Sequence, residues 1–384
     1  MNILFSAEYY PSHDNPITAF IAVLCREMTK QGHRVTVIAP QSLIEIVRHR
    51  RKREPFHFKD DIVVDNEIKS IDVYCPLAIS SGFGRLGRVT KWSHEWAVYL
   101  MSKKLPKPDV CYAHMWTSGY YIVRYASKNN IPLFIASGED KIIFHKYLSN
   151  EELGQLRDYT NGVICVSTKN AEESIACGLA KRERCRVFPN AVDDSQFYSM
   201  DKAECRRKLG YSQQDFIVAF VGRFYNRKGV NRVSDAIKHL NDPHVKSIFI
   251  GTNNPGETLQ PDCDGILFKG KLSHDVIPVY LNAADVFVLP TLAEGCSNSI
   301  VEALACGLPV ISSDLPFNYD LLNADNSILV NPNDIEEIAE AIKKLRHDET
   351  TRWKLSMNAL KTAKALSISQ RTRKIMDFIK EKCK

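Results

Sequence analysis

Residues 290–310 read PTLAEGCSNSIVEALACGLPV, and this stretch decides the fold class of the chain. It follows a short apolar run, DVFVL at residues 285–289, and ends by starting a second one, as is typical of buried parallel strands. Between the two strands the sequence predicts a helix that begins at Ser297 or Asn298 and stops at Gly307. A strand, a helix and another strand in close succession indicate an α/β domain with a parallel sheet.

Two glutamates of this stretch are candidate ligand-binding residues. Glu294 lies in the loop at the carboxyl end of the first strand, and Glu302 lies about one turn inside the helix, on the same face as Asn298. Carboxylates accept hydrogen bonds from vicinal hydroxyls, and the free N–H groups at a helix start can donate to a hydroxyl or a phosphate. The arrangement can therefore hold a polyol. Surface glutamates that only favour the helix dipole are the alternative that spacing leaves open.

Length and composition bound the class of protein. The 384 residues predict two or three domains, and the 44% hydrophobic and 25% charged residues are ordinary for a globular chain. No apolar run approaches the roughly 18 residues that span a bilayer. The apolar first ten residues include Glu8 and lack a basic start, so they predict a strand and not a signal peptide. Eleven cysteines without a CxxC pair predict free thiols in a reducing cytoplasm.

The sequence contains neither the HExxH zinc motif nor a CxxC pair, and we expect no metal. The net charge of +6 is mild, and no nucleic-acid module accompanies it, so a nucleic-acid partner is not expected. Much of the positive charge is local. Two explanations remain open for a local cluster of cations. It can be an ordinary solvated loop, or the Arg48–Arg53 region can make a peripheral contact with anionic lipid or with a phosphorylated acceptor. The cluster consists of Arg48, Arg50, Arg51, Lys52, Arg53 and Lys59.

The α/β pattern occurs twice along the chain. It begins with a strand at residues 2–6 and a helix at 19–31, and it restarts with a strand at 216–221 after the segment PNAVD at 189–193. We therefore predict two similar doubly wound domains, residues 1–195 and 196–368. The remaining tail has apolar residues at helical spacing, so it must bury a stripe.

The loop GRFYNRKG at residues 222–229 is a candidate diphosphate site. It follows a buried strand and precedes a helix, and it supplies cations beside a helix start. It is not a P-loop, because Gly229 is followed by Val230. A surface loop with ordinary charges remains the alternative. Gly270 lies at the end of another strand of the same domain. Its backbone could contact the edge of a nucleobase, or it could simply form a turn.

Polar residues also follow the strands of the first domain. His114, Glu139 and Asp140 end two strands on the same rim, which suggests an acceptor site, although a histidine at a strand end is often structural. Residues of the first loop, which follows the first strand, could join this rim. The acceptor-side candidates are His13, Asp14, Thr18, His114, Glu139 and Asp140.

Taken together, these motifs resemble those of retaining glycosyltransferases of family 4. The stretch from Glu294 to Val310 matches the EG(x6)EA(x3)G-P-V signature, residues 222–229 match GR(x4)KG, and residues 189–197 resemble the interdomain PNGVD…F strand. The resemblance implies the GT-B architecture: two Rossmann-like doubly wound domains facing across a cleft, with the last helix, residues 369–384, packing back on the first domain. It also implies a nucleotide-sugar donor and no required metal or other cofactor.

The family's roles can be carried over residue by residue. Arg223 and Lys228 would clamp the diphosphate, Glu302 would hold the ribose, and Glu294 would contact the donor sugar. The implied donor-binding residues are Gly222, Arg223, Lys228, Gly270, Glu294, Gly295, Cys296, Ser297, Asn298 and Glu302. The residues expected to carry catalysis are Glu294, Arg223, Lys228, His114 and Glu139.

The resemblance predicts transfer of a hexose-type residue, from a donor expected to be UDP-linked, to a saccharide or lipid-linked acceptor in cell-surface polysaccharide or glycolipid assembly. Two departures lie in the first domain: no glycine precedes Gly32, where the family commonly has a Gly-Gly pair, and the usual histidine near Glu139 is absent. They leave open a non-catalytic partner subunit of a glycosyltransferase complex. A sugar-nucleotide epimerase on the same architecture is a third reading, which the glutamate pair does not favour.

Overall fold

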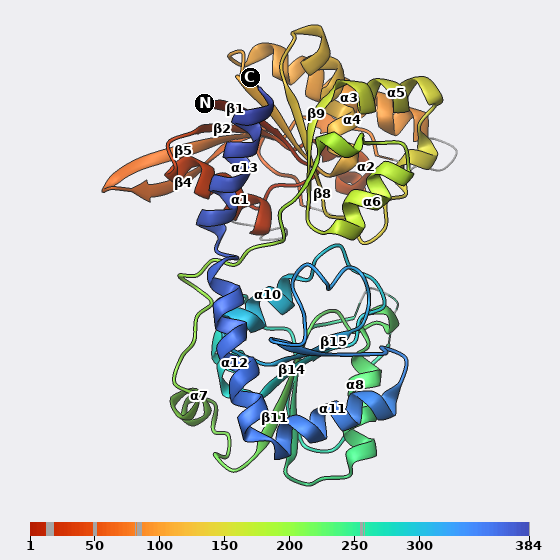
Figure 1. Ribbon diagram of the computed structural model, residues 1–384. Helices are drawn as coiled ribbons and strands as arrows, with labels where there is room; N and C mark the ends of the chain where they lie inside the picture. Colours follow the sequence, from red (N-terminus) through yellow and green to blue (C-terminus); the bar gives the residue numbers. More distant parts are fainter. Residues whose placement is uncertain are drawn as a thin grey trace. The chain divides into compact units, whose positions relative to one another are not determined.

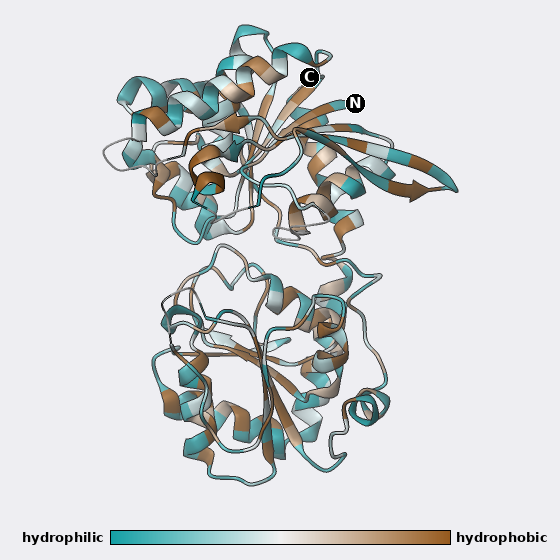
Figure 2. Ribbon diagram, turned by 180° about the vertical axis from the view of Figure 1, so that it is seen from behind, coloured by the Kyte–Doolittle hydropathy of each residue, from teal (hydrophilic) through white to brown (hydrophobic). Residues whose placement is uncertain are grey.

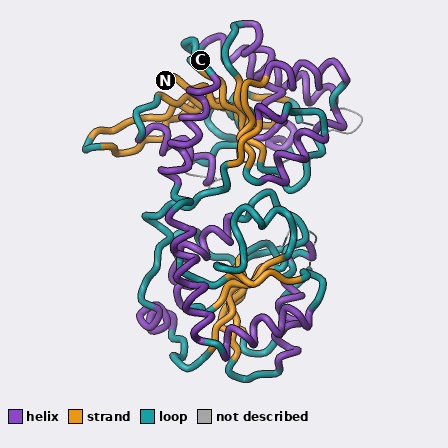
Figure 3. The backbone as a smooth tube through the Cα atoms, viewed as in Figure 1, coloured by secondary structure: helices purple, strands orange, loops and turns teal. Residues whose placement is uncertain are grey.

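The computed structural model describes residues 1–12, 19–48, 52–80, 82, 87–253, 256 and 258–383 (Figure 1). The chain forms two compact units, Met1–Phe188 together with Arg371–Lys384, and Pro189–Gln370. The division predicted after residue 195 thus lies a few residues beyond the end of the first unit's main segment, because the segment PNAVD belongs to the second unit. In each unit, helices cover a central sheet (Figure 3).

The first unit is built on an eight-stranded sheet of order β10-β9-β8-β7-β1-β2-β5-β4. Its strands run parallel, except that β4 and β5 form an antiparallel hairpin whose turn residues Asp65 and Asn66 have φ of 52° and 64°. The strands are β1 (Asn2–Ser6), β2 (Arg34–Ile38), β4 (His57–Val64), β5 (Glu67–Tyr74), β7 (Val110–His114), β8 (Leu133–Ser137), β9 (Thr160–Cys165) and β10 (Cys185–Val187), with a separate pair β3 (Gln41–Ser42) and β6 (Leu77–Ala78).

Apart from the short helix at Leu43–Val47, which has no buried residue, the helices of this unit pack their apolar faces on the sheet, whose strands β1, β7 and β8 are almost wholly buried. Hydrophobic residues accordingly gather along the strands, and hydrophilic ones along the outer helix faces (Figure 2). The helices are α1 (Ala19–Lys30), α2 (Leu43–Val47), α3 (Gly87–Lys104), α4 (Met115–Lys128), α5 (Asn150–Tyr159), α6 (Thr168–Ala176) and α13 (Ile368–Lys382), with 3-10 turns at Phe144–Tyr147 and Arg182–Arg184.

The C-terminal helix α13 belongs to the first unit from Arg371 onward. Its stripe of Ile375, Phe378 and Ile379 is at most 1% exposed. The Phe378 ring lies 6.0 Å from Phe134 and 5.6 Å from Phe188, measured between centroids. The amphipathic pattern of the tail therefore reflects real burial.

The second unit has a fully parallel six-stranded sheet of order β13-β12-β11-β14-β15-β16. Numbered within the unit, this is the order 3-2-1-4-5-6 of a doubly wound nucleotide-binding fold, and the order reverses between β11 and β14. Its strands are β11 (Phe216–Val221), β12 (Val245–Ile250), β13 (Ile266–Gly270), β14 (Val286–Leu289), β15 (Val310–Ser313) and β16 (Ser327–Val330). Its helices are α7 (Lys202–Leu209), α8 (Val230–Leu240), α9 (Ile277–Ala283), α10 (Asn298–Ala305), α11 (Ile335–His347) and α12 (Glu349–Lys364), with the 3-10 turn η3 (Asn226–Lys228).

Candidate active site

The two strongest sequence motifs meet at the reversal point of the second sheet. The loop 222–229 follows β11, and the loop 290–297 follows β14, its neighbour in the sheet. Ligands of open α/β sheets bind outside the carboxyl ends of the strands at such a point. Strand order therefore places both motifs where a nucleotide would bind.

An ion pair joins these two loops. The Lys228 ammonium contacts Oε1 of Glu294, and the two side chains are only 16% and 6% exposed. Thr291 Oγ1 donates to the same oxygen over 3.0 Å. The backbone continues the connection, because the Leu292 N–H donates to the carbonyl of Arg227 over 2.8 Å. Both charged groups are thus held in place before any ligand arrives.

Gly229 allows this close approach. Its φ is +81°, and a Cβ there would lie 2.6 Å from the carbonyl oxygen of Pro290. Glycine is the residue that tolerates both the left-handed backbone and the missing space. The final glycine of the GRFYNRKG loop is therefore required by the packing of the two loops.

Three glycines lie at the carboxyl-end edge of the second sheet, on the loops that follow β11 and β12 and at the end of β13. The Gly222 N–H donates to the carbonyl of Ile250, and the Gly251 N–H donates to the carbonyl of Gly270, over 2.9 and 2.8 Å. A Cβ on Gly251 would lie 1.8 Å from the Gly222 carbonyl oxygen. Gly222 and Gly270 therefore lie on one rim, where Arg223 is exposed.

Helix α10 presents the second half of the EG(x6)EA motif. Ser297 is its N-cap residue, without a capping bond from its side chain. The neighbouring Cys296 is buried, and its Sγ accepts from the Asn190 N–H over 3.3 Å. The Asn190 amide also donates to the Cys296 carbonyl over 2.9 Å and to Asn298 Oδ1 over 2.8 Å. The segment PNAVD thus anchors the turn after Gly295, and the Cys296 side chain is structural.

Glu302 has a partner that sequence reasoning missed. His274 Nε2 lies 2.9 Å from Glu302 Oε1, and this bond is the main cause of the raised pKa of His274. The two residues are 28 positions apart on different elements, so no spacing rule signals the pair.

In the first unit, Glu139 is fully engaged by its surroundings. Its carboxylate accepts from the N–H groups of Trp116 and Gly138, over 3.1 and 2.9 Å, and from Ser137 Oγ over 3.1 Å. Burial raises the pKa of Glu139, and these bonds oppose the rise. The carboxylate therefore fixes the start of α4 to the end of β8.

His114 ends β7, next to β8 in the sheet. Burial, with a smaller contribution from Arg371, lowers the pKa of His114 to about 4, so the ring is neutral at ordinary pH. Asp140 follows Glu139, and its carbonyl accepts from Lys169 Nζ over 2.5 Å. The other acceptor-side candidates, His13, Asp14 and Thr18, lie outside the described residues.

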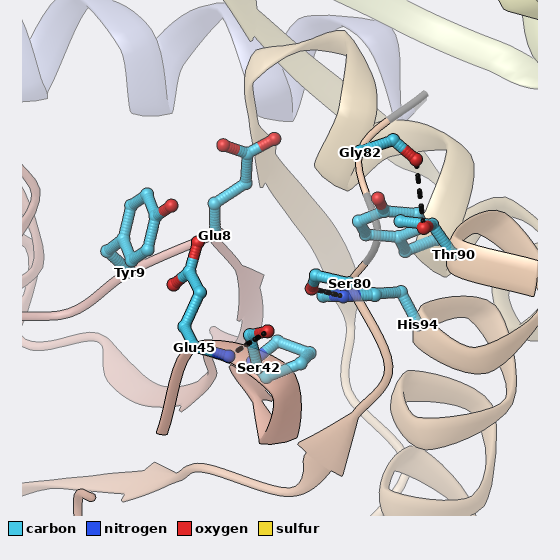
Figure 4. Close-up of a pocket in the computed structure, with 10 residues that line it drawn as sticks. Glu8, Tyr9, Ser42, Glu45, Ser80, Gly82, Thr90 and His94 are labelled. Carbon is cyan, nitrogen blue, oxygen red and sulfur yellow. Dashed lines mark hydrogen bonds between the residues drawn. The ribbon is translucent and has the colours of Figure 1, made fainter. Parts of the chain in front are cut away.

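The first unit also contains a pocket of about 190 Å³, which is lined in part by Glu8 and His94 (Figure 4). His94 Nε2 lies 2.7 Å from Ser80 Oγ, and the His94 ring stacks on Tyr121 with centroids 4.8 Å apart. Burial lowers the pKa of His94 to about 4. Burial also raises the pKa of Glu8, which a hydrogen bond with Thr117 lowers and Glu139 raises further. The lining residues are Glu8, Tyr9, Pro40, Ser42, Glu45, Ser80, Gly82, Thr90, His94 and Tyr121.

This lining offers hydroxyls, carboxylates and aromatic faces, which suit a saccharide. Sequence reasoning missed it, because its residues come from β3, α2, α3 and α4 and from the segments that follow β1, β2 and β6, and no local motif unites them. Within the described part of the chain, no group of three or more His, Cys, Asp or Glu side chains is placed to hold a metal ion. No described helix is long and apolar enough to cross a membrane.

Both halves of the chain match glycosyltransferase family models. Residues 17–196 match the model of "Glycosyltransferase Family 4", and residues 215–348 match that of "Glycosyl transferases group 1". A relative in Bacillus subtilis (strain 168), named as a teichuronic acid biosynthesis glycosyltransferase, TuaC, is 27% identical over 366 residues, 92% of this chain and 91% of the relative. A second relative is 29% identical over 232 residues, which are 57% of this chain and 60% of the relative's length. It is the Escherichia coli UDP-Gal:alpha-D-GlcNAc-diphosphoundecaprenol alpha-1,3-galactosyltransferase.

Among solved structures, the chain resembles Anabaena Alr3699/HepE in complex with UDP-glucose. The TM-score is 0.72 at 18% identity, over 99% of this chain and 100% of that one. The similarity confirms the predicted fold class, a GT-B fold with two Rossmann-like domains.

Proposed function

This chain is built from two glycosyltransferase domains, one of family 4 and one of group 1, and from this premise we propose that it is a retaining hexosyltransferase. It takes a hexose-type residue from a nucleotide sugar, UDP-linked, and transfers it to a saccharide or lipid-linked acceptor. The process served is cell-surface polysaccharide or glycolipid assembly. The relatives' names, which specify teichuronic acid biosynthesis and a diphosphoundecaprenol acceptor, support this setting.

The observation that carries the proposal is the Lys228–Glu294 pair at the reversal point of the second sheet. One charged group of each sign suits a donor with an anionic diphosphate beside a hydroxyl-rich sugar. We assign the diphosphate to Arg223 and Lys228, the sugar hydroxyls to Glu294, and the ribose to Glu302. The backbone N–H groups at the start of α10 are also available to the donor.

The chemistry follows from these assignments. When the bond between the anomeric carbon and the phosphate oxygen breaks, negative charge grows on the diphosphate, and Arg223 and Lys228 stabilise it. The acceptor oxygen attacks from the side of the departing phosphate, whose oxygen takes the acceptor proton, so the configuration is retained. This route asks for neither a metal nor a strong protein base. Glu294 and Glu302 are accordingly substrate-holding groups and not a hydrolytic acid/base pair.

We place the acceptor in the pocket of the first unit, between Glu8 and His94. The membrane contact is proposed for the basic segment after α2. Arg48, Lys52 and Arg53 are exposed there, and Val47 in the same region is 66% exposed. Cations beside exposed apolar side chains suit an anionic membrane surface, where a lipid-linked acceptor would reside.

Incubating the purified chain with nucleoside diphosphates and nucleotide sugars tests the donor half. Any ligand that binds the native state raises the unfolding temperature. We expect stabilisation by UDP and a UDP-sugar, and loss of turnover in Arg223→Ala and Glu294→Ala with the fold intact. Unchanged turnover in both variants would disprove the assigned roles.

A non-catalytic partner subunit is the second candidate. It is favoured by the complete engagement of Glu139 and by the missing family histidine in the first unit. Transfer or donor hydrolysis by the purified chain alone would exclude it.

A further inference from the structure

His274 lies in the loop between β13 and α9, on the carboxyl side of the second sheet. Its ring is held on three sides. Nε2 lies 2.9 Å from Glu302 Oε1, the Phe197 ring lies 5.0 Å away between centroids, and Gln196 Nε2 lies 3.3 Å from Nδ1. Gln196 Nε2 also donates to the His274 carbonyl over 2.9 Å. A surface histidine with these contacts has a fixed orientation, although its side chain is 52% exposed.

Glu302 depends on this ring for its own orientation. The Glu302 side chain is 13% exposed and projects from α10, and His274 bonds to Oε1 alone. An ionised carboxylate has about four acceptor positions, so Oε2 and one position of Oε1 remain for vicinal hydroxyls. Lys228 orients Glu294 in the same manner. Each glutamate of the motif is therefore held by a basic side chain from another loop.

We propose that His274 is a positioning residue for the donor, which holds the Glu302 carboxylate so that its remaining acceptor positions face the ribose hydroxyls. The inference rests on the proposed function, because it requires a nucleotide in this site. His274 itself touches the ribose-binding carboxylate and not the reacting atoms.

The surroundings of His274 also give the contact a pH dependence. Three carboxylates face the ring: Glu302 on α10, Asp275 on its own loop, and Asp193 in the segment before α7, and together they raise the pKa of His274 above its ordinary value. At low pH the charged ring therefore makes the stronger bond to Glu302, while its protonated Nδ1 no longer accepts from Gln196; the bond to Glu302 weakens as pH rises through this raised pKa. Nucleotide affinity should fall by a few-fold over that rise, because a neutral ring still donates one N–H.

Calorimetric titration of the full chain with UDP and with 2′-deoxy-UDP at pH 6 and pH 8 tests the proposal. We expect His274→Ala to bind UDP about tenfold more weakly at pH 6, the loss of one charge-assisted hydrogen bond. It should bind 2′-deoxy-UDP nearly as well as the wild type does, and it should lose the pH dependence. His274→Gln keeps an N–H donor, so it should restore most of the affinity without the pH dependence. His347→Ala, on the exposed end of α11, is the matched control.

The outcomes separate the two proposals. Equal UDP affinity in wild type and His274→Ala overturns the positioning role, as does an equal loss for UDP and 2′-deoxy-UDP, which would show a general structural effect. A wild-type chain that binds none of UDP, ADP and GDP overturns the proposed function, and this inference with it. In turnover assays, a raised donor KM with kcat retained supports positioning, and a loss confined to kcat contradicts it.

Discussion

Lys228 on the loop after β11 and Glu294 on the loop after β14 form an ion pair that is almost shielded from solvent. The two residues are 66 positions apart, and adjacent parallel strands bring them together. A charge removed from such a pair leaves its partner buried without compensation. The same ion pair therefore stabilises the second unit and holds the two charged side chains in position for a charged ligand.

Removing one partner should expose this coupling. We expect Lys228→Ala to cost about 3 kcal/mol of unfolding free energy, because it leaves the more buried Glu294 carboxylate without its partner, and Glu294→Ala to cost less, because the ammonium it leaves is the more exposed of the two. The double variant should cost less than the sum of the single ones. Urea unfolding of all four proteins measures the coupling, and strict additivity would show that the pair contributes nothing.

Gly229→Ala should destabilise the second unit and weaken donor binding. The added methyl group meets the Pro290 carbonyl, in addition to the strain of a left-handed backbone, which costs about 1–2 kcal/mol by itself. Gly210→Ala is the matched control, because Gly210 has a φ of +71° and nothing within 4 Å of its Cβ position. Chemical unfolding and UDP titration compare the two. Similar losses in both variants would argue against the close approach of the loops.

Phe378→Ala should destabilise the first unit by about 3–5 kcal/mol, because it empties a fully buried position in α13. The cavity would open beside Phe134 and Phe188. Glu381→Ala, one turn along the same helix, removes only an exposed ion pair with Arg186 and should change stability much less. Thermal unfolding and limited proteolysis provide the measurement, and equal behaviour of both variants would contradict the packing of the tail.

The first unit should lose stability as pH falls from about 6.5, the ordinary pKa of histidine, toward about 4. The folded-state pKa of His94 is lowered by burial to about 4, so the unfolded chain binds the additional proton across this window. His94→Gln should flatten the dependence, since glutamine can keep a hydrogen bond to Ser80 without titrating. Urea midpoints at pH 7 and pH 5 test this. An unchanged slope in the variant would exclude His94 as a source.

Replacing Arg48, Lys52 and Arg53 by glutamine should reduce sedimentation with anionic vesicles and leave neutral vesicles unaffected. Each cation near an anionic surface contributes about 1 kcal/mol, and salt should weaken the interaction further. Replacing Lys343, Lys344 and Lys354 by glutamine, three exposed cations on α11 and α12, controls for net charge. Equal loss with both sets would point to a general charge effect and not to a docking segment.

The sequence alone determined the architecture of the second unit and the two motifs proposed to bind the donor. Apolar runs of strand length alternate with capped amphipathic helices, and these local patterns depend on residues a few positions apart. Gly229, Glu294 and Glu302 stand out in the sequence for the same reason, because each lies at a fixed offset from a strand or helix end. The sequence also predicts the buried face of the tail, since burial of one face leaves a helical period.

Tertiary structure decided which side chains meet. The Lys228–Glu294 and His274–Glu302 contacts depend on strand order, which is set by packing of the whole sheet and leaves no trace in local spacing. The same holds for Glu139, whose carboxylate is engaged by the start of α4. The pocket at Glu8 and His94 joins four elements. Long-range contacts are thus the part of this protein that residue patterns could not predict.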